Sequence, residues 1–287
     1  MASLKEVKGR IASVNSTRKI TSAMKMVASA KLHKAQAAIE SMLPYERRLH
    51  HILTDFMSNC TEVTSPFIVK REVKKVAVVV FASNTSLCGG FNANVIRHLV
   101  DLLAEYKPLG LENILVFPVG KKVADAVRKL GFRIEGDFQH MADKPSYQEA
   151  ADLAADLMKR FLHGDVDKVE LLYNHFKSTA SQILTRETYL PIDLNNEKKE
   201  EERTIDYILE PSAEELMQEM LPKVSRMKMF TVLLDSNAAE HAARTMAMQI
   251  ATDNANELLQ ELTVMYNKSR QQSITNELLD IVGGSMA

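Results

Sequence analysis

Apolar residues recur at intervals of three and four along the first forty or so positions, which is the spacing of a coiled-coil contact surface. This seam comprises Leu4, Val7, Ile11, Val14, Arg18, Thr21, Lys25, Ala28, Leu32, Ala35, Ile39 and Met42. Its three middle members are polar, although apolar side chains are typical of such positions. Either the polar residues stay within the seam, or the contact face shifts there to Ile20, Met24 and Val27.

The end of the chain carries the same kind of pattern over a longer stretch. The 60 residues from Lys223 to Val282 include no glycine or proline. As a helix they would span roughly 90 Å, whereas a compact globule of this chain length has a radius of gyration of about 19 Å. This segment must therefore project as a rod, and we expect it to pair antiparallel with the shorter first helix and to extend beyond it. Its predicted seam comprises Asn237, His241, Arg244, Met248, Ala251, Ala255, Leu258, Leu262 and Met265, followed on a shifted face by Ile274, Leu278 and Ile281.

Local signals place the ends of both helices. Pro44 is expected to end or bend the first helix, with helical character resuming to about Cys60. Ser212 is the expected N-cap of the last helix, with Glu215 completing a capping box. Pro222 is expected to introduce a kink.

Between the two helices, short β-branched runs alternate with helical patterns. The predicted strands are residues 76–83, 113–120, 132–138, 168–176 and 181–192, and the predicted helices are 92–106, 121–130 and 147–163. This alternation is typical of an α/β domain with a largely parallel sheet, in which the last two strands could form an antiparallel edge. The predicted organisation is an N-terminal coiled-coil helix (1–60), a central α/β domain (73–194), a charged connector (195–210) and a long C-terminal coiled-coil helix (211–287).

Charge and hydropathy narrow the classes of partner. The chain is 46% hydrophobic and 25% charged, as in an ordinary soluble protein with a core. Residues 1–50 hold ten Lys or Arg against three Glu, a balance of +7 that suits an acidic protein surface, nucleic acid or anionic lipid. No base-reading motif is visible, and the cations are spread around the helix. No apolar run approaches the eighteen or so residues that span a bilayer, and MASLKEVKGR has no signal region. We expect a cytoplasmic chain that meets membranes only through another protein.

Candidate chemistry is sparse. The turn Leu87–Asn92 (LCGGFN) follows a predicted strand and precedes a helix, where phosphate-binding loops occur. It lacks both GxGxxG and a following Lys-Ser or Lys-Thr, which favours a tight turn over a nucleotide site. Cys88 has no evident acid or base partner, Cys60 and Cys88 lack metal-type spacing, and His241 has no second ligand four residues on. We predict no catalytic residue, cofactor or metal. An α/β enzyme using this turn and a nucleic-acid-binding module remain the alternatives.

The two ends together carry a specific resemblance. KITSAMKMVASAKL (Lys19–Leu32) and the segment Arg244–Gly284, which ends in ITNELLDIVGG, closely resemble the gamma subunit of the F-type ATP synthase. LCGGFN matches the LCGGxN of that family, although Asn84-Thr85-Ser86 stands where Asp-Arg-Gly is usual. The resemblance runs from end to end. The inserted two-cysteine segment of light-regulated plastid members is absent, which leaves the bacterial and mitochondrial members, and the absence of a transit peptide favours the bacterial ones.

This resemblance implies a fold and a function. The terminal helices would form a coiled coil inside a ring of alpha and beta subunits, and the Rossmann-like central domain would lie against epsilon and the membrane rotor ring (c-ring). The chain would be a non-catalytic rotor shaft that transmits proton-driven rotation to the catalytic beta subunits and regulates ATPase activity and proton flow. Its expected place is the cytoplasmic face of the bacterial inner membrane, as a peripheral part of the complex.

Five positions match family residues that meet the beta subunit. Arg244, Gln271 and Thr275 match residues that hydrogen-bond a beta loop near the upper shaft. Met24 and Lys25 match the region facing an acidic lever segment of beta, where other members can carry Glu in place of Lys25. Our hypothesis is that the basic first helix is attracted electrostatically to these levers; ordinary surface and seam packing is the alternative for all five positions.

Overall fold

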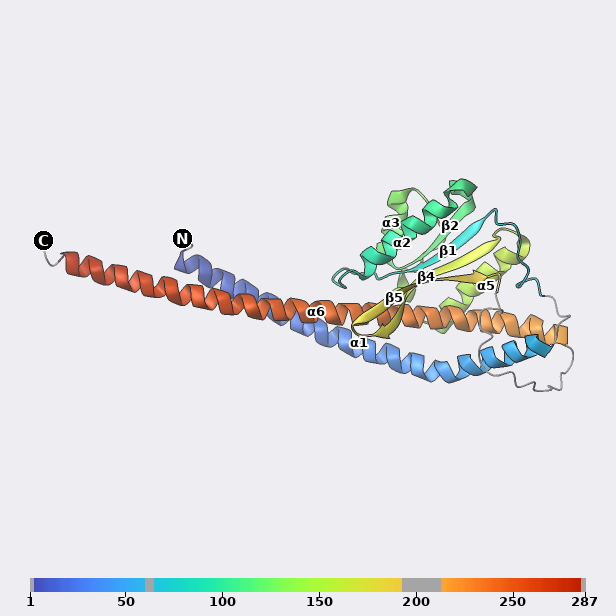
Figure 1. Ribbon diagram of the computed structural model, residues 1–287, viewed down its shortest axis with the longest axis horizontal. Coiled ribbons are helices and arrows are strands. Elements are labelled where there is room, and N and C mark those ends of the chain that lie inside the picture. The colour runs from blue at the N-terminus through green and yellow to red at the C-terminus, as the bar shows by residue number, and fades with distance from the viewer. Residues whose placement is uncertain (1–2, 60–64, 193–212, 285–287) are drawn as a thin grey trace.

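Two long helices form a rod, and a compact α/β domain lies along one side of it (Figure 1). The computed structural model describes residues 3–59, 65–192 and 213–284. Helix α1 (Leu4–Asn59) has 56 residues and helix α6 (Ala213–Gly284) has 72. They run antiparallel, so that both chain ends lie at the same end of the rod, and α6 extends beyond the start of α1. The prediction of two paired terminal helices of unequal reach is confirmed.

The polar residues of the first helix stay within the seam. Val7, Ala28, Leu32 and Ala35 are buried, and so is Thr21 at 9% exposure. The Thr21 hydroxyl lies 2.8 Å from the Thr252 hydroxyl of α6. By contrast, Ile20 and Val27 are each 59% exposed, so a shift of the contact face to these residues is wrong.

The seam of α6 departs from the predicted spacing near its end. Leu258 and Met265 are 43% and 48% exposed, whereas their neighbours Leu259 and Tyr266 are half-buried. The assignment of Leu258 and Met265 to the seam is therefore wrong. The reason is that a straight helix has 3.6 residues per turn, so a strict seven-residue repeat drifts around it by about 20° per heptad. Upstream, the buried members of the predicted seam are Asn237, His241, Arg244, Met248 and Ala255.

Neither proline ends its helix. Pro44 lies within α1 and Pro222 within α6. Helix α1 curves in its second half (Figure 1), and Leu53, beyond Pro44, is 1% exposed in the core of the central domain. Packing of the helix beyond Pro44 offsets the hydrogen bond that the proline lacks. Cys60, the connector 195–210 and the N-cap Ser212 lie outside the described residues, and a kink at Pro222 stays a prediction.

The central domain contains a five-stranded sheet in the order β3-β2-β1-β4-β5. Its strands are β1 (Val76–Phe81), β2 (Ile114–Val119), β3 (Arg133–Ile134), β4 (Lys168–Ser178) and β5 (Ser181–Leu190). All pairs are parallel except β4 with β5, which confirms the predicted antiparallel edge. Strand β3 has two residues, so the expected strand 132–138 is too long. The backbone turns away at Gly136, where φ is 76°.

Helices cover both faces of the sheet and make two cores. On one face, α2 (Phe91–Tyr106) and α3 (Lys121–Leu130) pack on alternate strand residues such as Val78 and Val116. On the other face lie α4 (Gln139–Asp143), α5 (Tyr147–His163) and the first part of α6, over Val79 and Phe117. Short 3-10 turns, η1 (Lys107–Leu109) and η2 (Leu111–Asn113), precede β2. Because α6 belongs to this core from Met217 to Leu233, one continuous helix is both a layer of the domain and half of the rod.

Candidate functional site: the shaft and its junction with the central domain

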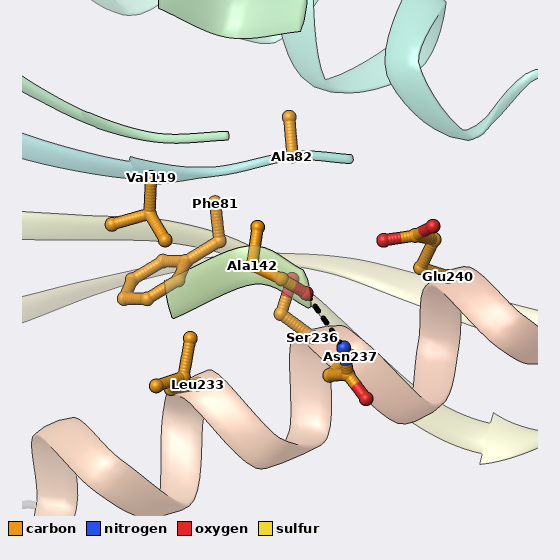
Figure 2. A pocket seen from close by; sticks show the side chains of 8 residues that line it. All are labelled: Phe81, Ala82, Val119, Ala142, Leu233, Ser236, Asn237 and Glu240. Atoms are coloured by element: carbon orange, nitrogen blue, oxygen red, sulfur yellow. Dashed lines mark hydrogen bonds between the residues drawn. The ribbon is translucent and has the colours of Figure 1, made fainter. Parts of the chain in front are cut away.

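The carboxyl edge of the sheet is closed by α6. Ligands of open α/β sheets bind outside the carboxyl ends of the strands. Here Leu233 of α6 points toward Phe81 at the end of β1, and the Asn237 amide of α6 donates a 2.9 Å hydrogen bond to the carbonyl of Ala142 (Figure 2). The cavity between them measures about 10 Å³, which is room for about one water molecule. A nucleotide does not fit in this cavity.

The turn after β1 is filled by its own side chains. The Ser83 hydroxyl donates to the carbonyl of Thr85 at 2.6 Å, and the Asn92 amide lies 3.1 Å from the sulfur of Cys88. Cys88 is 1% exposed. Leu87 has the left-handed φ of 68° and is 60% exposed. The segment is therefore the tight turn that its sequence predicts, and the sulfur of Cys88 is held by polar groups that neither accept nor deliver protons near neutral pH.

This turn is joined to the shaft by Arg244. One guanidinium nitrogen of Arg244 donates to the backbone carbonyl of Ser86, and another forms a 2.6 Å ion pair with Glu240, one helical turn away. Arg244 and Glu240 are 9% and 8% exposed. Burial raises the pKa of Glu240, and the attraction of Arg244 opposes that rise. Charge-assisted hydrogen bonds in such a dry site are stronger than neutral ones, so Arg244 firmly connects the central domain to the rod.

A buried histidine lies next to this ion pair. His241 is 7% exposed, and its Nδ1 has no hydrogen-bond partner among the described residues. Burial, together with the nearby cations Lys31 and Arg244, lowers its pKa to about 4, although Asp143 acts in the opposite direction. His241 is therefore neutral at pH 7. In the described ranges no three His, Cys, Asp or Glu side chains are placed to hold a metal ion.

The β4–β5 hairpin is fastened to α6 by buried polar contacts. Asp235 of α6 accepts a 2.8 Å hydrogen bond from the backbone N–H of Phe176. The Tyr189 hydroxyl donates a 2.8 Å hydrogen bond to the carbonyl of Ser225, and both residues are at most 5% exposed. Together with the shared core, these contacts make the domain and the lower rod a single mechanical unit.

The five predicted partner residues fall into separate groups. Met24 and Lys25 are half-buried, Lys25 within the α1 seam and Met24 next to it, close to the Thr21–Thr252 contact. Gln271 and Thr275 are exposed neighbours on α6, and the Thr275 hydroxyl donates to the Gln271 carbonyl at 2.9 Å. Gln271 lies about 28 Å along the helix from Thr252. Arg244 is buried in the junction, with its donors directed at its own chain.

The tip of α6 is a single helix with exposed apolar side chains. The Thr21–Thr252 contact fixes the register of the antiparallel pair, which places Leu4 opposite about residue 269 of α6. Beyond that level α6 has no partner helix in the part of the chain described. Its exposed large apolar residues there are Ile274, Leu278, Leu279, Ile281 and Val282, each at least 49% exposed. Exposed apolar side chains gathered at one end of a helix are typical of a surface that binds another protein, a membrane or a ligand.

Sequence reasoning missed the partners of Arg244. The spacing of Glu240 and Arg244, four residues apart, was a readable signal for an ion pair on one helix face. Ser86 contributes only its carbonyl, which every residue type supplies, so nothing in its identity reveals the contact. The anchors Asp235 and Tyr189 were likewise not predicted, because each depends on which strand lies against α6.

The arrangement defines a structural class: a two-helix rod whose longer helix is also a layer of a Rossmann-like domain with a closed sheet edge. A family model described as ATP synthase matches residues 3–287. The chain is 81% identical to the ATP synthase gamma chain of Phocaeicola vulgatus and 64% identical to that of Bacteroides fragilis, with 100% of each chain covered. It therefore belongs to the family of ATP synthase gamma chains.

Solved structures share the fold at lower identity. One chain comes from the cryo-EM structure of the rotor of the Euglena gracilis mitochondrial ATP synthase; it has a TM-score of 0.61 and 19% identity, covering 94% of this chain and 98% of that one. Another comes from the central stalk and c-ring of the Tetrahymena thermophila enzyme; it has a TM-score of 0.58 and 21% identity, covering 81% and 99%. At these identities the likeness concerns the fold. None of the described helices is long and apolar enough to cross a membrane.

Proposed function

We propose that this gamma chain is the rotor shaft of an F-type ATP synthase and has no catalysis of its own. It transmits rotation driven by the proton gradient to the catalytic beta subunits, for ATP synthesis or hydrolysis, and regulates ATPase activity and proton flow. The observation that carries this proposal is the continuity of α6, which runs for 72 residues from the core of the central domain to the exposed tip. Torque applied to the domain thereby reaches the tip through one helix.

The asymmetry of the rod supports a mechanism of coupling. One side carries the central domain, the pair of helices curves, and only one helix reaches the tip (Figure 1). The surrounding beta subunits would each meet a different face of such a rod. A partner can shift a conformational equilibrium only by its differential contacts with the two states. Each beta subunit would therefore be biased toward a different nucleotide affinity according to the angle of the shaft.

The proposed partners follow from this place in the complex. The rod would lie within the ring of alpha and beta subunits, and the central domain would contact epsilon and the c-ring. The chain would meet the membrane only through the complex, on the cytoplasmic face of the bacterial inner membrane. The closed sheet edge supports the absence of a nucleotide cofactor at that edge of the domain. The identity of 81% to a bacterial gamma chain supports the bacterial setting.

The beta contacts are proposed at the five positions that match the family. Gln271 and Thr275 offer exposed polar groups close to the apolar tip, and Met24 and Lys25 are half-buried on the basic first helix. Arg244 offers the least surface of the five. We further propose that the positive charge of Lys25 strengthens coupling by attracting acidic lever segments of beta, an effect that dissolved salt would screen over about 10 Å at 0.1 M.

The proposal is tested by assembling the complex with its own alpha, beta and membrane subunits in vesicles, with this chain present or omitted. We expect ATP-driven proton pumping only when the chain is present. Lys25→Glu should reduce pumping and weaken its dependence on salt, whereas Lys34→Glu, on an exposed position of the same helix, should leave both unchanged. Pumping without this chain would refute the rotor function. Unchanged pumping and salt dependence in Lys25→Glu would refute the electrostatic part.

A titration of the purified chain distinguishes the other two classes. Tight binding of ATP would favour an α/β enzyme, and DNA affinity that falls steeply with salt would favour a nucleic-acid-binding module. The cavity of about 10 Å³ at the sheet edge predicts no ATP binding there.

A further inference from the structure

We propose that Arg244 is a positioning residue: it fixes the tip of the loop Asn84–Gly90 against the shaft, and the loop then turns with the rod as a rigid projection. The claim that Arg244 holds the loop rests on contacts within this chain alone. The claim that the held loop affects coupling rests on the proposed rotor function.

The base and the far side of the loop are anchored by other groups. The Asn84 side chain donates to the carbonyl of Gln139 at 2.8 Å and accepts a 2.8 Å hydrogen bond from the N–H of Lys121. On the far side Cys88 is buried in a cluster that includes Ala239 of α6. The tip between these anchors consists of Ser86 and the exposed Leu87. Arg244 reaches the tip from the shaft, at the carbonyl of Ser86.

The arginine side chain suits this position. Its planar guanidinium presents several donors in a fixed fork, so that one side chain can satisfy two acceptors in different directions. One is the carboxylate of Glu240 on the same helix, and the other is the carbonyl of Ser86 on the central domain. Glu240 thereby orients Arg244, and Arg244 orients the loop. A lysine, with a compact ammonium group, would not hold both contacts with the same geometry.

The fixed tip carries a residue in a costly conformation. Leu87 has φ of 68°, a left-handed conformation that is unfavourable for a residue other than glycine. Such a conformation persists only where the surrounding contacts determine it. Arg244 supplies one of these contacts at the adjacent residue. The loop therefore has a less strained alternative that becomes accessible when Arg244 is removed, and its exposed apolar side chain would then leave its fixed place on the rotor surface.

This role differs from a direct contact between Arg244 and the beta subunit. Both roles predict that removal of Arg244 harms coupling. Only the positioning role predicts that a covalent tie between loop and shaft compensates for the loss. The chain offers a place for that tie, because a Cβ at Gly89 would lie 3.8 Å from the Cβ of Ala247. This is the usual Cβ–Cβ distance in a disulfide, about 3.8 Å.

The experiment uses Gly89→Cys with Ala247→Cys in a chain whose two native cysteines, Cys60 and Cys88, are replaced by serine. In the assembled complex we measure the rate at which the 89–247 disulfide forms under mild oxidation. The test variant adds Arg244→Met with Glu240→Gln. These changes remove the hydrogen bond from Arg244 to the loop without leaving a buried unpaired carboxylate. The control adds Arg97→Met, which removes an exposed arginine of α2.

We expect the disulfide to form roughly tenfold more slowly in the test variant than in the control, a ratio that corresponds to the loss of one hydrogen bond to a charged group. Assembly of the complex, judged by co-purification of all subunits, should be equal in the two. Equal rates of disulfide formation would overturn the positioning role. Arg244→Lys, with Glu240 retained, should give an intermediate rate, because only one of the two contacts can be kept.

The second measurement is proton pumping per ATP hydrolysed in vesicles. We expect the reduced test variant to pump less than the reduced control, and oxidation to restore at least half of the loss. Slow disulfide formation with pumping that oxidation does not restore would overturn action through the loop and favour direct contact with beta. Slow disulfide formation with unimpaired pumping would support the positioning role and would contradict its proposed effect on coupling. Failure of the positioning role and failure of the proposed rotor function therefore give different results.

Discussion

The hydrogen bond between Thr21 and Thr252 permits a sharp test of the helix pairing on which the shaft depends. The two hydroxyls lie 2.8 Å apart across the seam. Each also lies within hydrogen-bonding distance of a carbonyl of its own helix, at 3.0 Å for Thr21 and 2.7 Å for Thr252. Valine replaces the hydroxyl with a methyl group of similar size and retains the β-branch. The perturbation is Thr21→Val and Thr252→Val, singly and together.

The expected magnitudes follow from this geometry. A single substitution removes the hydrogen bond between the helices but leaves the other hydroxyl bonded to its own backbone, so each should cost about 1 kcal/mol in free energy of unfolding. The double variant places two apolar groups in contact and should cost less than about 0.5 kcal/mol. The coupling energy between the sites is then about 1 kcal/mol or more. With an unfolding entropy of about 2.1 cal/mol/K per residue over 287 residues, each single substitution should lower Tm by about 2 °C.

The assay is urea unfolding of the full chain followed by far-UV circular dichroism, since the chain has no tryptophan and its long helices dominate that signal. The matched control is the cycle of Thr17→Val and Thr263→Val. These exposed hydroxyls donate to the Ser13 and Leu259 carbonyls of their own helices, and the two sites should show no coupling. If the double variant at 21 and 252 lost as much stability as the sum of its singles, the register described for the helix pair would be refuted.

Three further predictions concern the junction and the central domain. Tyr189→Phe should lower the free energy of unfolding by about 0.5–1.5 kcal/mol, because it removes a buried hydrogen bond to a carbonyl of α6. In the same urea titration, Tyr147→Phe, at a residue 43% exposed, should change the free energy of unfolding by less than about 0.5 kcal/mol. The pKa of His241 is about 4 in the folded chain and about 6.5 when unfolded, so the unfolded state binds the proton first, and the free energy of unfolding should fall by up to about 3 kcal/mol as pH falls from about 6.5 to 4. His241→Gln should flatten this part of the plot of stability against pH, and an equally steep loss in that variant would contradict the lowered pKa of His241. Gly120→Ala should abolish soluble expression, since its Cβ would lie 2.1 Å from a backbone oxygen of the neighbouring strand end, whereas Gly131→Ala, with open space around it, should cost only the roughly 1–2 kcal/mol of a left-handed backbone.

Much of the architecture was readable from the pattern of residues. A run without glycine or proline that is too long for a globule must become a rod, and short β-branched runs separated by helical segments must become a covered parallel sheet. The antiparallel edge was also readable, because a short connection between the last two strands permits no crossover. The length of β3 was not readable from the residue pattern, since this edge strand has only two residues and the backbone turns at Gly136, where φ is 76°.

The candidate site was predicted less completely. The sequence shows that the middle of the first helix has polar residues at seam spacing, but it allows two contact faces there. The contact between Thr21 and Thr252 in the structure selects the polar one. Arg244 lies in a family motif, and its spacing from Glu240 indicates an ion pair within α6. Nothing in the sequence indicates that Arg244 also bonds to the central domain. A contact to a backbone carbonyl leaves no trace in residue identity, and the residue that supplies it lies 158 positions away.

The sequence by itself determined that two long helices would pair beside an α/β domain, because periodicity and the absence of helix breakers are local properties of the chain. Only the tertiary structure decided that α6 would close the carboxyl edge of the sheet and that Arg244 would join the loop to the rod. These features depend on how a helix is rotated and shifted over a sheet. A rotation of one residue, 100°, would direct a different set of side chains at Phe81 and Ser86, and that choice is made by the packing of the whole domain.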